Sequence, residues 1–303
     1  MKMITTVSLA IISLLLVIFL APLFEGVIRK LKAVVHSRKG PPFRQPYLDL
    51  LKLLGKEDLK VTENPLFSLA PIVTFGSILI AALFTPMGTP PPLGFAGDLI
   101  VLVYFLTLAS VGVMLGGAAT GSPYGTIGMG REMMLSMMVE IILVASLIVG
   151  VIQTHSFDLG QISSWYQEAG PNLSMIIAAI PFFLALQVQL GKLPFDIPDA
   201  DQEIMGGPFI EAAGPKLALY KWSYFAKQVI LTSLFLEIFI PWPKTGIVPV
   251  DIIINLVKVF IVILVVGLID AVNPRIRVDQ AIRYFVGIWA ISIFAIAFAL
   301  IGV

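Results

Sequence analysis

The sequence contains no cysteine and only two histidines, His36 and His155. Iron–sulfur clusters are held by sets of cysteine thiolates, and protein zinc sites by clusters of cysteine and histidine. Neither kind of site can be built from these residues, and disulfides are excluded. We therefore expect no metal and no redox centre in this chain, so that any electron transfer takes place in another subunit.

Charge is also scarce, because only 13% of the 303 residues are charged while 58% are hydrophobic, and the mean hydropathy is +0.96. This combination is typical of a polytopic membrane protein. The net charge of +1 gives no indication of a nucleic-acid partner. We expect an all-α protein whose residues 1–303 form one integral-membrane domain.

The apolar residues are gathered in runs of roughly 18 to 22 residues, each long enough to cross a hydrocarbon core of about 30 Å. Such runs predict about eight transmembrane helices. They lie at 3–23, 67–85, 98–118, 133–153, 174–190, 223–240, 251–271 and 284–302.

The loops between these runs differ in charge. Alternate loops, including 25–64 and 191–222, hold sixteen of the twenty Lys and Arg residues. The positive-inside rule therefore places these loops in the cytoplasm and both termini outside, in a cell membrane. Within the first basic loop, residues 43–56 alternate leucines with charges and predict an amphipathic helix that lies in the membrane plane or packs under a partner.

The second basic loop also holds an acidic stretch. Pro198 and the turn at 206–208 predict a short helix that places Asp199 and Glu203 on one face. One interpretation is a solvated acidic loop. We favour burial, because apolar residues are interleaved with the carboxylates, and burial would raise and couple their pKa values for proton handling. The five carboxylates of this stretch are Asp196, Asp199, Asp201, Glu203 and Glu211.

Charged residues inside apolar runs are costly and are functional candidates by default. Glu140 is the deepest carboxylate, eight residues beyond Glu132. We expect Glu140 to carry a proton, with Lys258 or a water chain as its neighbour. Lys227 and Glu237 stand near the ends of the sixth run, where we expect their charges to snorkel to the surface.

Several short motifs together resemble the family of H-type membrane subunits of complex I. They are RKGPP at 38–42, QPY at 45–47, LKLLGKE at 51–57 and PFD at 194–196. Others resemble more closely the hydrogenase branch of this family, which contains formate hydrogenlyase subunit 4 and the equivalent membrane protein of archaeal membrane-bound hydrogenases. These are TGSPY at 120–124, RE at 131–132, VE at 139–140, GKLPFD at 191–196, IPW at 240–242 and NPRIRVD at 273–279.

This resemblance implies a membrane coupling subunit of an energy-converting respiratory complex. A cytoplasmic arm of hydrogenase type, linked to ferredoxin and H₂ evolution, or the arm of a related sulfur-reducing complex, would carry the iron–sulfur clusters and the active metal site. In a hydrogenase that site would be nickel–iron. Antiporter-like subunits would move protons or sodium ions. By matching position, the five loop carboxylates, Glu132 and Glu140 would form the coupling path. The basic loops would contact the arm through Arg38, Lys39, Arg44, Arg275 and Arg277.

The sequence departs from the quinone-using pattern of the family at three places. Asp199 and Asp201 replace the usual glutamates, EAAG at 211–214 replaces EYSG, and GRE at 130–132 replaces a sequence of the SYE type. We therefore expect no quinone. Two alternatives remain open: a quinone-chamber subunit of an NADH dehydrogenase-type complex, and a stand-alone ion transporter, although the sequence shows no convincing inverted repeat.

Overall fold

The computed structural model describes residues 2–302, except for the side chains of residues 2–5 and 201. Every regular element in this range is helical. The helices are α1 (Lys2–Val35), α2 (Gln45–Leu54), α3 (Pro65–Phe84), α4 (Leu99–Ala119), α5 (Pro123–Thr154), α6 (Leu159–Ala169), α7 (Leu173–Gln189), α8 (Asp201–Ile204), the 3₁₀ helix η1 (Gly207–Phe209), α9 (Gly214–Phe239), α10 (Val248–Val272) and α11 (Val278–Ile301).

The predicted all-α membrane fold is confirmed, and each of the eight apolar runs coincides with a helix. Within the described residues, six helices are long and apolar enough to span a membrane: α1, α3, α4, α5, α10 and α11. The other two are α7, which has only 17 residues, and α9, whose 26 residues include several polar side chains. The prediction of about eight spans is therefore approximate.

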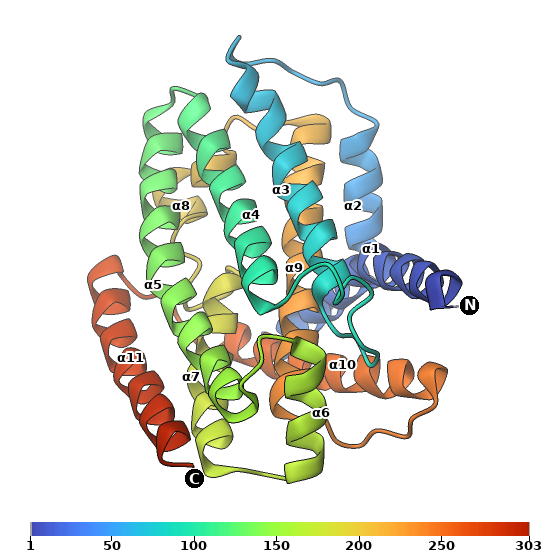
Figure 1. Cartoon of the computed structure of the whole chain (residues 1–303). Helices are drawn as coiled ribbons and strands as arrows, with labels where there is room; N and C mark the ends of the chain where they lie inside the picture. The colour runs from blue at the N-terminus through green and yellow to red at the C-terminus, as the bar shows by residue number, and fades with distance from the viewer. Residues whose placement is uncertain (1, 303) are drawn as a thin grey trace.

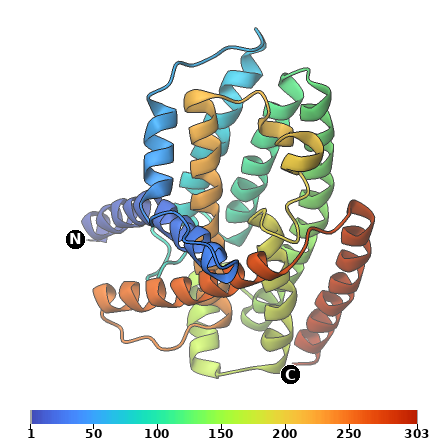
Figure 2. The same ribbon diagram turned by 180° about the vertical axis from the view of Figure 1, so that it is seen from behind.

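Helix α9 is the centre of the molecule and is buried along most of its length. Helices α3, α4, α5 and α9 run in similar directions, whereas α1 and α10 lie side by side and cross them (Figure 1). The view from behind shows both crossing helices passing over α9 (Figure 2). Helix α11 packs against α5 and α7.

Two glycines let α4 approach its neighbours closely. A Cβ atom on Gly112 would lie 2.3 Å from the Oγ1 atom of Thr74 in α3, and one on Gly116 would lie 2.0 Å from the Oη atom of Tyr220 in α9. A side chain at either position would therefore force the neighbouring side chain to shift, as at other small-residue interfaces in membranes.

Three helices extend further than the apolar runs predict. Helix α1 continues to Val35, so the basic segment from residue 25 begins inside a helix, and α5 and α9 each begin about ten residues early. The charged segment can stay helical because its side chains are paired: Arg29 forms ion pairs with both Glu25 and Asp49. The predicted amphipathic helix is found as α2.

Candidate functional site

The acidic stretch lies directly on α5. Gly128 of α5 contacts the 3₁₀ helix η1, since a Cβ atom added to Gly128 would stand 2.5 Å from Cδ of Pro208. The predicted helix from Pro198 is shorter than expected, because α8 begins only at Asp201. Asp199 precedes it and Glu203 belongs to it, so these two carboxylates do not share a helix face.

A cavity of about 450 Å³ lies beside this stretch. Aromatic and apolar side chains, among them Phe209, Tyr220 and Phe225, form part of its wall. Charged side chains, including Glu25 and Asp199, form another part. The volume is within the usual range of small-molecule sites.

Three much smaller cavities continue from this one toward the interior. The first, of about 30 Å³, shares Asp199 and Tyr224 with the large cavity and adds Asp196 and Glu132. The second and third, of about 10 Å³ each, are lined by Glu132 with Lys227, and then by Lys227 with Glu140. A cavity of that size admits about one water molecule. We call this sequence of cavities the polar row.

Four of the seven predicted path carboxylates line the polar row: Asp196, Asp199, Glu132 and Glu140. Gln189 lines both the first and the last of the small cavities. The row therefore links the acidic stretch to the deepest carboxylate of α5.

The other predicted path residues do not join them. Glu203 is exposed and pairs with Arg131 at 2.8 Å and with Arg275 at 3.3 Å. The hydrogen bond from Arg131 holds the pKa of Glu203 below its ordinary value, with added attraction from Arg275, so the expected rise in pKa is wrong for this group. Glu211 is half-buried and is not among the residues that line these cavities, and the side chain of Asp201 lies outside the described residues.

Two expectations for the charged residues inside apolar runs are wrong. Lys227 and Glu237 do not snorkel, because both are buried, with 7% and 5% of their surface exposed. Lys227, not Lys258, is the lysine beside Glu140. Lys258 instead donates hydrogen bonds to the carbonyl oxygens of Ile240 and Pro241, near the far end of α9.

Sequence reasoning also missed Tyr224, which lines the large cavity and the first two small ones. The available signal was helical spacing. Tyr224 and Lys227 are three residues apart in α9, so they share a face of that helix. Both residues lie in the predicted run 223–240, so this spacing was visible in the sequence.

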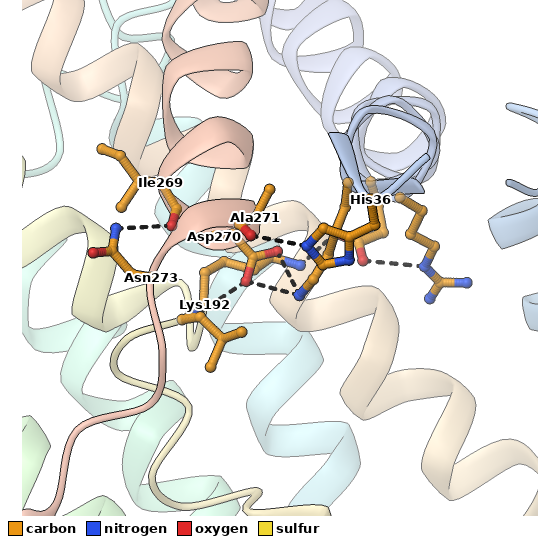
Figure 3. A network of polar contacts seen from close by, with 10 residues as sticks. His36, Lys192, Ile269, Asp270, Ala271 and Asn273 are labelled. Carbon is orange, nitrogen blue, oxygen red and sulfur yellow. Dashed lines mark hydrogen bonds and ion pairs between the residues drawn. The ribbon is translucent and has the colours of Figure 1, made fainter. Parts of the chain in front are cut away.

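The loop before the acidic stretch is fixed by two buried carboxylates. Asp270 of α10 accepts hydrogen bonds from Nζ of Lys32 at 3.1 Å and from the backbone N–H of Leu193 at 3.0 Å, and Lys192 pairs with Glu25 at 2.7 Å. Figure 3 shows Asp270 between His36 and Lys192, with His36 bonded to the carbonyl oxygen of Ala271. These contacts hold α1, α10 and the loop together.

Among the residues predicted to contact a redox arm, four are exposed: Arg38, Lys39, Arg44 and Arg277. The fifth, Arg275, is half-buried and bonds Glu203 and the carbonyl oxygen of Asp196. Its guanidinium is therefore engaged within the chain.

Comparison with known proteins gives a consistent answer. Residues 7–301 match the family model described as NADH dehydrogenase. The chain is 36% identical to hydrogenase-4 component C of Escherichia coli over 241 residues, which cover 78% of this chain and 76% of that protein. It is 32% identical to formate hydrogenlyase subunit 4 of Escherichia coli over 278 residues, covering 89% and 91%. It is also 30% identical to NADH-quinone oxidoreductase subunit 8 of Thermus thermophilus over 278 residues, covering 84% and 75%.

A solved structure matches almost the whole chain. It is a chain of the membrane-bound sulfane sulfur reductase, an archaeal respiratory membrane complex. The TM-score is 0.88 at 27% identity, covering 97% of this chain and 99% of the other. The resemblance stated from the motifs is thereby confirmed.

Proposed function

The chain belongs to the NADH dehydrogenase family, and we propose that it couples a cytoplasmic redox arm to ion translocation in a membrane respiratory complex. We take the arm to be of the hydrogenase type, linked to ferredoxin and H₂ evolution, as the relatives named hydrogenase-4 component C and formate hydrogenlyase subunit 4 suggest. Antiporter-like subunits in the same membrane would carry the protons or sodium ions.

The observation that carries this proposal is the polar row. It begins at the large cavity, where charged side chains admit water, and passes Asp199 and Glu132. It ends at Glu140, within an apolar part of α5. Carboxylates inside a membrane are costly and are typical of proton relays. A row that starts at a loop and ends deep in the chain suits a subunit that passes protons to the neighbouring membrane subunits. It also suits a subunit that responds to a change of charge in the redox arm and transmits that change to those neighbours.

The chain's own groups supply acid–base chemistry and anchoring. Exposed basic side chains at Arg38, Lys39, Arg44 and Arg277 suit an arm with acidic or polar loops. Iron–sulfur clusters and a nickel–iron site would belong to that arm, because this chain has no cysteine to hold them. We further propose that the complex lies in the plasma membrane with both termini of this chain outside.

Glu140→Gln tests the proposal in the assembled complex. Glutamine keeps the size of the side chain but cannot exchange a proton. We expect assembly and electron transfer to persist, while the ions moved per electron in sealed vesicles fall by about twofold or more because the row is interrupted. Glu140→Ala serves as the comparison. An unchanged ratio in Glu140→Gln, with loss of assembly in Glu140→Ala alone, would show that Glu140 is only structural.

The large cavity favours a second candidate function, a quinone chamber in an NADH dehydrogenase-type complex. Its volume of about 450 Å³ and its wall of Phe209, Tyr220 and Phe225 would accommodate an aromatic headgroup. The two functions predict different contents of the purified complex. For the first we expect nickel in the metal analysis and no quinone in the organic extract. Stoichiometric quinone without nickel would favour the second.

A further inference from the structure

Glu132 and Glu140 cannot exchange a proton directly. They are eight residues apart on one helix, which corresponds to about 12 Å of rise. Hydrogen-bonded transfer works over about 3 Å between heavy atoms, or through one bridging water. A group on another element must therefore stand between them if the polar row is continuous.

The side chain of Lys227 reaches this gap from α9. It lines one small cavity with Glu132 and the next with Glu140. Gln189 also lines a small cavity with each carboxylate, but its amide has no titratable proton to pass on. Coulomb attraction links Lys227 to both carboxylates. Its Nζ atom also donates a hydrogen bond to Oγ of Ser110 in α4 at 3.4 Å, which holds the ammonium near the middle of the row.

We propose that Lys227 is the proton carrier between Glu132 and Glu140. The inference rests on the coupling function proposed above and assigns a residue to the step that the two carboxylates leave open. In the forward direction an N–H bond of the Lys227 ammonium breaks as its proton passes to the Glu140 carboxylate. The neutral amine then takes the proton of protonated Glu132, so that one N–H bond is broken, one is formed and no charge is lost. Each transfer passes through one water, since each of the two small cavities has room for about one.

The chemistry of lysine suits this step. A buried lysine readily loses its proton, whereas arginine stays charged in proteins. A fixed counter-ion for two carboxylates needs only its positive charge, which arginine keeps although its guanidinium is larger. Lys227→Arg therefore separates a carrier from a counter-ion, and Lys227→Met removes the charge while keeping the length of the side chain.

The experiment compares these variants in the complete complex in sealed vesicles. The readouts are co-purification of the partner subunits, the electron-transfer rate and the ions moved per electron. We expect Lys227→Arg to assemble and to transfer electrons while the ions moved per electron fall by about twofold or more, because arginine does not release its proton. Lys227→Met is expected to lower the ratio as well. Lys258→Met is the matched control, because that half-buried lysine lies outside the polar row, and we expect its ratio to be unchanged.

Two outcomes overturn the proposal. If Lys227→Arg keeps the parental ratio, Lys227 is a counter-ion or has no part in transfer, whatever Lys227→Met does. If neither variant assembles, the role of the lysine is structural. Glu140→Gln, measured in parallel, keeps the two hypotheses apart. A lowered ratio in Glu140→Gln with a parental ratio in Lys227→Arg rejects the carrier and leaves the polar row standing as the coupling path, whereas parental ratios in both reject the polar row as that path.

Discussion

Gly128 shows how a single residue positions the acidic stretch. Its missing side chain lets the backbone of Gly207 and Pro208 lie against α5, with Cα of Gly207 only 2.7 Å from where a Cβ atom would stand. The same contact brings Asp199 to the mouth of the polar row. Gly130, two residues further along α5, has nothing within 4 Å of the equivalent position.

These two glycines give a matched prediction. Gly128→Ala overpacks the contact and should destabilise the folded chain by roughly 1–3 kcal/mol. Gly130→Ala should be neutral or stabilising by up to about 1 kcal/mol, because alanine favours a helix. The measurements are thermal unfolding of the purified chain and hydrogen exchange over residues 201–210, which we expect to quicken only in Gly128→Ala. Equal behaviour of the two variants would mean that the stretch is not held by this contact.

Residue types alone predicted part of the candidate site. Glu132 and Glu140 stood out because a carboxylate within an apolar run is costly to place in a membrane and is therefore a functional candidate. Lys227 was misjudged for a geometric reason. The apolar run that contains it begins at 223, whereas α9 begins at Gly214, so Lys227 lies thirteen residues, or about 20 Å, into the helix. The partners of Glu203 were also out of reach of the sequence, because Arg131 and Arg275 meet it across distant segments.

At the scale of elements, hydrophobic runs predicted where helices occur but not how they cross. Run length fixes whether a helix can span a bilayer, whereas its tilt is set by its packing partners. Helices α1 and α10 are among the most apolar in the chain, yet they lie across α9 instead of beside it (Figure 2). These two helices are held to one another by the pair of Lys32 with Asp270, and by Gly267, where a Cβ atom would meet Leu31 at 3.0 Å.

The extra length of α1 follows from the same contacts. The last turns of α1 carry basic residues. Judged from the sequence alone, such residues predict an exposed loop at the membrane surface. Pairing of Arg29 with Asp49 and of Lys32 with Asp270 neutralises them inside the fold, so the helix continues to Val35. Long-range ion pairs of this kind leave no signal in a single sequence.

At the scale of the whole molecule, the loops separate into two groups. Helix α2, the turn between α4 and α5, and α8 lie toward one end, whereas α6 lies toward the other (Figure 1). This is the separation that alternating loop charge predicts, since the basic loops belong to the first group. Which end faces the cytoplasm is a matter of the positive-inside rule and stays a prediction.

The absence of cysteine makes this orientation directly testable, because the parent chain has no background reaction with maleimides. Single cysteines can be placed at exposed positions of each group, with Ser37→Cys and Gln202→Cys in the basic loops, Glu168→Cys in α6 and Gly302→Cys after α11. A membrane-impermeant maleimide should label Glu168→Cys and Gly302→Cys in right-side-out vesicles, and Ser37→Cys and Gln202→Cys in inverted ones. Labelling of the detergent-solubilised chain checks that each thiol is reactive. If Gly302→Cys reacts from the same side as Gln202→Cys, an even number of helices crosses the membrane between these two residues, so one of α9, α10 and α11 does not span it. The acidic stretch would then have to be assigned to a side of the membrane anew, because Gln202 lies within it.

If the whole labelling pattern is reversed, the polar row would open away from the cytoplasm, and a cytoplasmic redox arm could not deliver protons to it.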